Sequence, residues 1–382
     1  MAAPIQLIDA DAHVNPPPTF WNDYLPAKLQ DRGPQIEAGK PGEDHDWVVF
    51  EGVRKPLMIL SALGGRKVEN YKSTGRQSDQ LKGNWEPAAR LADMETDGVD
   101  TAVIYGGGPL GTADNELYVA SFEAYNRWLA DFCSYDPKRL AGVAYLPMQN
   151  IAQSVEMLKT AAKLGLRGVN IPAFPQSPAG VVGGGFAAQV LALTGDPDGE
   201  LQYDDPAFDV FWKAAVDHDM AITIHLGARI ARPGVQRFLS NLVMSKVTMA
   251  EPIAIMIFGG VFQRFPQLRF GSIESGVGWF AWMAEYMDAI WHNQRHWVNN
   301  TLTQPPSFYM DQNVYGSFIR DAHGVANRNL PGGRNIMWST DYPHSETTWP
   351  NSRDNIENNF AGVSEAERRP ILCDNARKFY GL

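Results

Sequence analysis

Two carboxylates and an imidazole alternate within residues 8–13, in the sequence Ile-Asp-Ala-Asp-Ala-His. Alternate residues of a β-strand share a face, so Asp9, Asp11 and His13 are predicted to point the same way. Two carboxylates and an imidazole on one face are unfavourable unless a positive charge lies between them. The spacing therefore favours a metal site over a solvated strand end.

Three later apolar segments also end in residues that bind metals or transfer protons. One closes with His225, the next with Glu274, and the last with Asp341, which His344 follows three residues later. A histidine after an apolar run is often a core residue, whereas a lone buried carboxylate is costly. The recurrence of such groups at four segment ends predicts a single metal-dependent active site.

The segments that carry these residues are short, β-branched and separated by helical stretches, which is typical of a (β/α)₈ barrel. The carboxyl ends of barrel strands meet at one face, where active sites lie. The pattern predicts eight strands, at Ile5–His13, Thr101–Tyr105, Leu140–Leu146, Leu166–Ile171, Met220–His225, Leu268–Glu274, Val314–Phe318 and Asn335–Asp341.

Two insertions follow predicted strands at the active-site face. Residues 16–84 come after the first strand, and residues 173–206 come after the fourth. We expect both to shape or cover a pocket for a small-molecule substrate. Neither a repeat nor a linker interrupts the chain, so residues 1–382 are expected to form one barrel domain.

The composition narrows the possible partners. The 382 residues carry a formal net charge of −10, and the lysines and arginines form no basic run, which argues against nucleic-acid binding. Two cysteines cannot build a disulfide framework, which favours a cytoplasmic location. No apolar run reaches the roughly 18 residues that a membrane span needs. The aromatic segment Trp279–Trp297 suggests a homo-oligomer, or a hetero-oligomer with family relatives.

The chain resembles the amidohydrolase-related family, in the branch that includes aminocarboxymuconate-semialdehyde decarboxylase. Matching motifs run along most of the chain, at 9–13 (DADAH), 139–147 (RLAGVAYLP), 264–268 (RFPQL), 274–276 (ESG) and 339–344 (STDYPH). The resemblance implies metal ligation by Asp11, His13, His225 and Asp341, with Asp341 also serving as a base toward water. Asp9 matches a residue that more often supports the strand, so it ranks below Asp11.

The departures from the family pattern enlarge the set of possible ligands. Asp11 replaces the first histidine of the family's His-x-His pair, Glu274 replaces the histidine of the sixth strand, and no lysine ends the fourth. Six residues could then bind metal, more than the three or so that a catalytic zinc takes. They are His13, His225, His344, Asp11, Glu274 and Asp341, with His323 as a weaker candidate for a supporting or substrate contact.

The ligand count suits two iron ions, or manganese with iron, since both metals accept mixed imidazole and carboxylate ligation. We therefore expect an O₂-activating dinuclear monooxygenase that hydroxylates a small organic substrate, as in a few proteins with this barrel. The alternative is a hydrolase or nonoxidative decarboxylase with one zinc or manganese ion, in which Glu274 and His344 act as acid–base groups. A third possibility is a metal-binding subunit without chemistry of its own.

Overall fold

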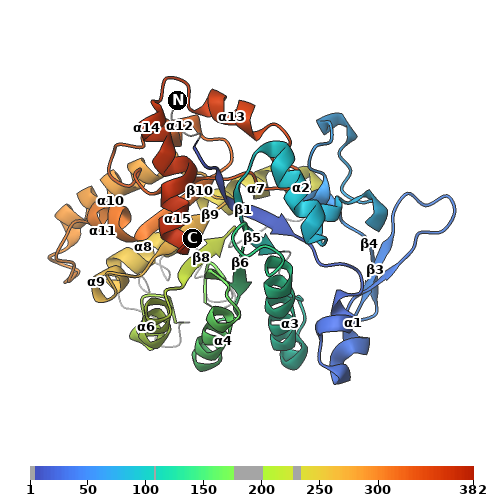
Figure 1. Cartoon of the computed structure of the whole chain (residues 1–382). Coiled ribbons are helices and arrows are strands. Elements are labelled where there is room, and N and C mark those ends of the chain that lie inside the picture. The colour runs from blue at the N-terminus through green and yellow to red at the C-terminus, as the bar shows by residue number, and fades with distance from the viewer. Residues whose placement is uncertain (1–4, 107–108, 176–200, 227–233) are drawn as a thin grey trace.

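The computed structural model describes residues 5–106, 109–175, 201–226 and 234–382. Within these residues, eight parallel strands form one sheet in chain order, which confirms the predicted (β/α)₈ barrel (Figure 1). The strands are β1 (Ile8–Val14), β5 (Thr101–Gly106), β6 (Leu140–Tyr145), β7 (Gly168–Ile171), β8 (Ala221–His225), β9 (Phe270–Ile273), β10 (Val314–Phe318) and β11 (Ile336–Trp338).

The barrel closes through the residues that follow β11. The backbone N–H of Asp341 donates to the carbonyl of Asp11 over 2.9 Å, and that of His13 donates to the carbonyl of Tyr342 over 2.6 Å. These bonds fix the end of the last strand against the first. Two segments more than 300 residues apart in sequence therefore meet at the metal-site motif.

Helices surround the sheet, as Figure 1 shows. Asp114 and Asn150 cap α3 and α4, because each side chain accepts a hydrogen bond from a backbone N–H of the first helical turn. The larger described helices are α2 (Pro87–Asp97), α3 (Asn115–Cys133), α4 (Ile151–Lys163), α6 (Asp209–Asp217), α7 (Phe238–Val247), α8 (Ala250–Phe258), α10 (Phe280–Gln294), α11 (Pro306–Asn313) and α13 (Ser352–Asn359). Shorter helices are α1 (Phe20–Tyr24), α9 (Val261–Arg264), α12 (Ala322–Ala326), α14 (Glu365–Arg369) and α15 (Asn375–Tyr380).

The insertion after β1 folds partly as a small antiparallel sheet of β2 (Gln35–Glu37), β3 (Trp47–Phe50) and β4 (Val53–Pro56). Its later part returns to the barrel, where Gly64 N–H donates to the carbonyl of Pro343, and Ser345 N–H donates to that of Leu60. The insertion therefore lies against the loop that follows β11. Most of the insertion at 173–206 lies outside the described residues.

A shift in strand register changes which residues of β1 face the barrel interior. The pairing of β1 with β5 shifts between Asp9 and Ala12. Ile8 and Ala10 pack with Tyr105 in the hydrophobic cluster inside the barrel, which we call the inner cluster. Ala12 packs in the other cluster, between the strands and the surrounding helices. Asp9 is therefore placed differently from Asp11 and His13, and the expectation that the three share a face is wrong.

Helix α15, the last helix of the chain, packs against the inward-facing residues of the barrel strands. Phe379 and Tyr380 join the inner cluster of strand residues, and both are fully buried. The hydroxyl of Tyr380 donates to the carbonyl of Ala10 over 3.1 Å and lies 2.7 Å from the hydroxyl of Tyr105. Tyr380 of α15 and Tyr105 of β5 therefore meet inside the barrel.

Two helices expose apolar surface. On α10, the rings of Trp282 and Tyr286 stack 5.5 Å apart and are both more than half exposed, in the segment expected to lie between subunits. The segment Val235–Phe258 is long and apolar enough to cross a membrane by length and composition alone, although charged residues such as Lys246 and Glu251 interrupt it. One such helix is weak evidence for a span, and the α8 part buries Ile253, Met256 and other residues in the core.

Candidate metal centre

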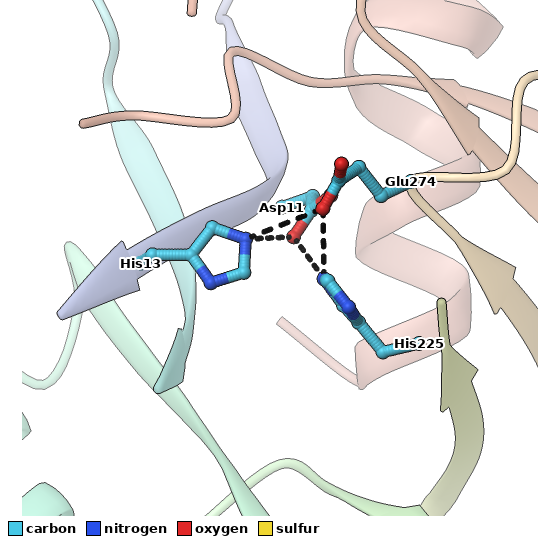
Figure 2. A group of neighbouring side chains, drawn as sticks. All are labelled: Asp11, His13, His225 and Glu274. Atoms are coloured by element: carbon cyan, nitrogen blue, oxygen red, sulfur yellow. Dashed lines mark hydrogen bonds and ion pairs between the residues drawn. The ribbon is translucent and has the colours of Figure 1, made fainter. Parts of the chain in front are cut away.

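Four side chains from three strand ends point toward one another at the mouth of the barrel (Figure 2). Nε2 of His13 and Nε2 of His225 each lie 3.1 Å from Oδ1 of Asp11. Oε2 of Glu274 lies 3.7 Å from Nε2 of His225 and 4.0 Å from Nε2 of His13. One possible ligand atom from each residue fits within 4.8 Å of the others, so this group could hold a metal ion.

A second group shares two residues with the first. His13 and Glu274 gather again with Asp341 and His344, with ligand atoms within the same 4.8 Å. Oδ1 of Asp341 lies 3.2 Å from Nε2 of His13 and 2.8 Å from Nδ1 of His344. The His13 and His344 rings stack 3.9 Å apart. The six residues predicted as ligands therefore fall into two overlapping groups that share His13 and Glu274.

Several of these atoms are buried without a hydrogen-bond partner. They are Oδ2 of Asp11, Nε2 of His13, Oε2 of Glu274 and both carboxylate oxygens of Asp341, of which Oδ1 has only its ion-pair contacts with His13 and His344. Buried polar atoms are almost always satisfied, and an unpaired buried charge is strongly unfavourable. Imidazole nitrogens and carboxylate oxygens are the donors that divalent manganese, iron and zinc accept. The site thus has the composition and unmet bonding capacity of a metal centre.

The imidazoles and carboxylates shift one another's protonation. Burial disfavours the charged form of Asp11, but the neighbouring His225 and His13 outweigh it and hold the pKa of Asp11 below its usual range. Burial likewise opposes the charge on His13, yet Asp11 and Asp341 raise its pKa to about 10. Burial and the charges of Asp341 and Asp11 raise the pKa of Glu274 well above its usual value. Without a cation, these shifts favour the protonated forms of His13 and Glu274.

Two of the strand-end carboxylates carry backbone strain. Glu274 has a φ of 57° and Asp341 a φ of 58°, the left-handed region that residues other than glycine rarely adopt. Glu274 directly follows the last residue of β9, and Asp341 lies three residues beyond the end of β11. Strain of this kind concentrates at functional sites, where the surrounding structure must stabilise it.

The two weaker candidates lie away from the cluster. Asp9 accepts hydrogen bonds from the backbone N–H and the hydroxyl of Thr340. Burial raises the pKa of Asp9 to about 7 despite these bonds. Asp9 thus anchors the loop after β11 to β1, as the resemblance implied. His323 is exposed on α12 and belongs to neither group of possible ligands.

A cavity of about 440 Å³ opens directly over the cluster. His13, Glu274 and His344 contribute to its polar side, and the insertion after β1 contributes Leu60 and Ser61. The expectation that this insertion shapes a pocket is therefore confirmed for the residues described. Apolar and aromatic side chains complete the wall, among them Tyr145, Leu226, Phe238 and Leu242.

Sequence reasoning missed one cation at the site. Nζ of Lys246, on α7, lies 3.3 Å from Oε1 of Glu274 and 2.8 Å from Oε2 of Glu346. Burial opposes its charge, but Glu274 and Glu346 outweigh this and raise the pKa of Lys246. The signal was a lone lysine within the apolar stretch at 238–258.

Comparison with known proteins identifies the family. The amidohydrolase family model matches residues 8–382, so the chain belongs to that family. A curated relative, the 2-amino-3-carboxymuconate-6-semialdehyde decarboxylase of Dictyostelium discoideum, is 25% identical over 324 residues, which cover 78% of this chain and 77% of the relative.

Solved structures show the same fold. An amidohydrolase from Mycobacterium avium subsp. paratuberculosis K-10 matches with a TM-score of 0.72 and 20% identity, over 100% of both chains. A dihydroxybenzoic acid decarboxylase from Polaromonas sp. JS666, solved with bound manganese and the inhibitor 2-nitroresorcinol, matches with a TM-score of 0.64 and 17% identity. That alignment covers 99% of this chain and 98% of the other.

The expectation of an O₂-activating monooxygenase is wrong. The relative from Dictyostelium and the manganese-containing protein from Polaromonas are decarboxylases, which are lyases and not oxidoreductases. The prediction took the number of possible ligands as evidence for redox metals. Carboxylate and imidazole ligands fit manganese or zinc as well as iron, so their number does not specify O₂ chemistry.

Proposed function

We propose that this protein is a metal-dependent nonoxidative decarboxylase of a small organic acid, built as one barrel domain. The observation that carries the proposal is the ring of buried, unpartnered carboxylate and imidazole atoms beneath a cavity of about 440 Å³. The decarboxylase names of the relatives support this reaction over others that a metal barrel performs.

One divalent ion, which we take to be manganese, would be held by Asp11, His13, His225 and Glu274. These residues form the group whose ligand atoms approach one another from three strand ends. When bound, the ion would bind substrate oxygens and stabilise the negative charge that develops as the carboxylate leaves. Once a metal displaces the protons of the cluster, Asp11, Glu274 and Asp341 would carry three negative charges against the one positive charge of Lys246, which favours a divalent ion.

The protein's own part in the reaction is to supply a proton. Loss of CO₂ leaves the bonding electron pair on the substrate carbon, and a proton must replace the carboxylate there. His344 lines the cavity and is held by Asp341 over 2.8 Å. Burial lowers the pKa of His344, although Asp341 opposes the shift, so its protonated form is a stronger acid than free imidazole. We assign His344 as the proton donor and Asp341 as the group that orients it.

The cavity walls would orient the substrate and exclude water. Leu60, Leu226 and Leu242 supply apolar surface to the cavity wall. Tyr145 also lines the cavity, where its hydroxyl donates to the carbonyl of Gly106 over 3.1 Å. Apolar walls around a few fixed polar groups are typical of small-ligand sites. They favour a largely apolar acid whose carboxylate faces the metal centre.

The test is CO₂ release from a panel of hydroxylated aromatic and unsaturated carboxylic acids by the manganese-loaded protein. Reactions run under argon and in air should release equal amounts of CO₂ from the active substrate, one per product formed. Metal analysis should find one equivalent of manganese. Turnover of the substrate without CO₂ release would refute the decarboxylase, and two tightly bound ions would refute the single-ion site.

A hydrolase is the second candidate function, because the solved neighbour with a TM-score of 0.72 is an amidohydrolase. The same centre could activate water for attack on an ester or amide. A panel of such compounds, followed by acid release without CO₂, separates this candidate from the first.

A further inference from the structure

Helix α7 turns one side toward the active-site cavity. Phe238 and Leu242 line the cavity, and Lys246 reaches Glu274 at its edge. Residues four apart lie on one face of a helix, so these three side chains form a single stripe. The other face is open to solvent, with Leu239 exposed by 75% and Val243 by 61%. The inner stripe of α7 is thus part of the cavity wall.

Apolar packing holds α7 only weakly. The helix contains no buried residue, although its sequence is largely apolar. Helices in folded proteins gain most of their stability from burying an apolar face, so α7 requires another attachment. The segment at 227–233 that precedes it lies outside the described residues.

Lys246 provides such an attachment. Its ammonium group bridges Oε1 of Glu274, which follows β9, and Oε2 of Glu346, in the loop after β11. The Lys246 side chain is 24% exposed and that of Glu274 only 4% exposed. Solvent weakens a partly buried ion pair less than an exposed one. Removing the cation of such a pair takes away a charge that compensates the buried carboxylate.

We propose that Lys246 is a positioning residue that ties α7 to the metal centre through Glu274 and to the β11 loop through Glu346. The two contacts of Lys246 fix the positions of Phe238 and Leu242 in the cavity wall. It also occupies Oε1 of Glu274, so that Oε2 faces the imidazoles of His13 and His225. This role is separate from the reaction, because it is the same for a decarboxylase and for a hydrolase.

Backbone hydrogen exchange of the full-length, manganese-loaded protein tests the attachment. In Lys246→Met, the amides of α7 should exchange at least about tenfold faster than in the wild type, while those of α3 keep their rates. Lys246→Arg, which retains the charge, should restore most of the protection. Lys213→Met is the matched control, because Lys213 forms an exposed pair with Asp217 on α6.

The contact between Lys246 and Glu346 is tested by a double-mutant cycle. Glu346→Gln alone should raise exchange in α7 by less than Lys246→Met does. In the double variant it should add nothing to the effect of Lys246→Met, because the shared contact is already lost. Additive effects would overturn the bridge. Wild-type exchange of α7 in Lys246→Met would overturn the attachment as a whole.

The contact between Lys246 and Glu274 can be tested by spectroscopy, independently of catalytic turnover. The electron paramagnetic resonance spectrum of bound Mn²⁺ should change in Lys246→Met, because Glu274 is no longer held through Oε1. It should return toward the wild-type spectrum in Lys246→Arg and remain unchanged in Lys213→Met. A wild-type spectrum in Lys246→Met would overturn the positioning of Glu274, whatever reaction the enzyme catalyses.

Discussion

Asp11 and Asp97 are both buried carboxylates, but their neighbours give them different properties. Asp97 accepts hydrogen bonds from the backbone N–H of Ser352 over 2.8 Å and from its hydroxyl. Burial outweighs these bonds and raises the pKa of Asp97. Asp11 instead has one oxygen without a partner and two imidazoles beside the other. Burial alone therefore does not mark a metal ligand, whereas unmet bonding capacity next to imidazoles does.

Asp11→Asn should weaken Mn²⁺ binding by at least about 100-fold, because it removes a charged ligand from the centre of the group. The side chain keeps its shape, so the fold should be retained. Isothermal titration calorimetry measures the affinity, and circular dichroism checks the fold. Asp97→Asn is the matched control and should bind Mn²⁺ as the wild type does; equal binding by both variants would remove Asp11 from the ligand set.

His344→Gln should lower kcat for decarboxylation by about 10²–10⁴-fold, the usual contribution of a general acid. The bound manganese should remain, since the proposed ligands are intact. CO₂ release and metal content are measured on the same preparation. His218→Gln serves as the control, because His218 is exposed at the end of α6, before β8 begins. Loss of metal from His344→Gln would instead make His344 a ligand.

The residue types at the site were predictable, but their contacts were only partly so. Asp11, His13 and His225 were expected to meet, because parallel strands end at one face, and the structure brings them together. Strand alternation could not separate Asp9 from Asp11, because it does not reveal a register shift, and only the family resemblance ranked Asp9 lower. Lys246 was missed because it lies on a helix, where nothing local indicates a partner 28 residues away.

At the scale of elements, the positions of the strands followed from apolar patterning, and their ends did not. The sixth strand was predicted to reach Glu274, but β9 ends at Ile273. Likewise β11 ends at Trp338, before Asp341. The left-handed backbone of Glu274 and Asp341 depends on bonds to distant segments, such as the one from Asp341 N–H to the carbonyl of Asp11. A local pattern cannot contain that information.

Helix α14 offers a prediction at this scale. Ser364 and Glu367 form a capping box, and Glu367 also pairs with Arg328 over 2.6 Å. The hydrogen bond with Ser364 and that with Arg328 lower the pKa of Glu367 to about 2. A lowered pKa means that Glu367 adds stability above its unfolded pKa of about 4.3, and that this stability is lost as the pH falls toward 2.

Glu367→Gln should therefore lower the urea midpoint at pH 6, and its difference from the wild type should shrink as the pH falls from about 4 toward 2. Urea unfolding followed by tryptophan fluorescence across this range gives the comparison. Glu365→Gln, in the first turn of the same helix, is the control and should show a smaller difference at pH 6. A constant difference between Glu367→Gln and wild type at every pH would contradict the assignment.

For the whole molecule, the metal centre joins the first strand, the last strand and the middle of the barrel. A ligand that binds only the folded state stabilises it by RT ln(1 + [L]/Kd), about 2.7 kcal/mol at 100 times Kd. Manganese should thus raise the thermal midpoint of the entire barrel, not only of the residues that bind it. Removal of the metal with a chelator should lower that midpoint, and excess Mn²⁺ should restore it.

The size of this effect should grow with pH. In the metal-free protein, the pKa of His13 is raised to about 10 and that of Glu274 is also raised, so both shifts favour the protonated forms. A metal ion must displace these protons, and its affinity rises as they become easier to remove. Because the raised pKa of His13 stabilises the metal-free fold below about pH 10, that stabilisation weakens as the pH increases.

The gap in thermal midpoint between manganese-loaded and chelator-treated protein should therefore widen from pH 6 to pH 8, as scanning calorimetry can measure. The double variant Asp11→Asn/His225→Gln should show no gap at either pH; a gap that narrows in the wild type would mean that protons do not compete with the metal at His13 and Glu274.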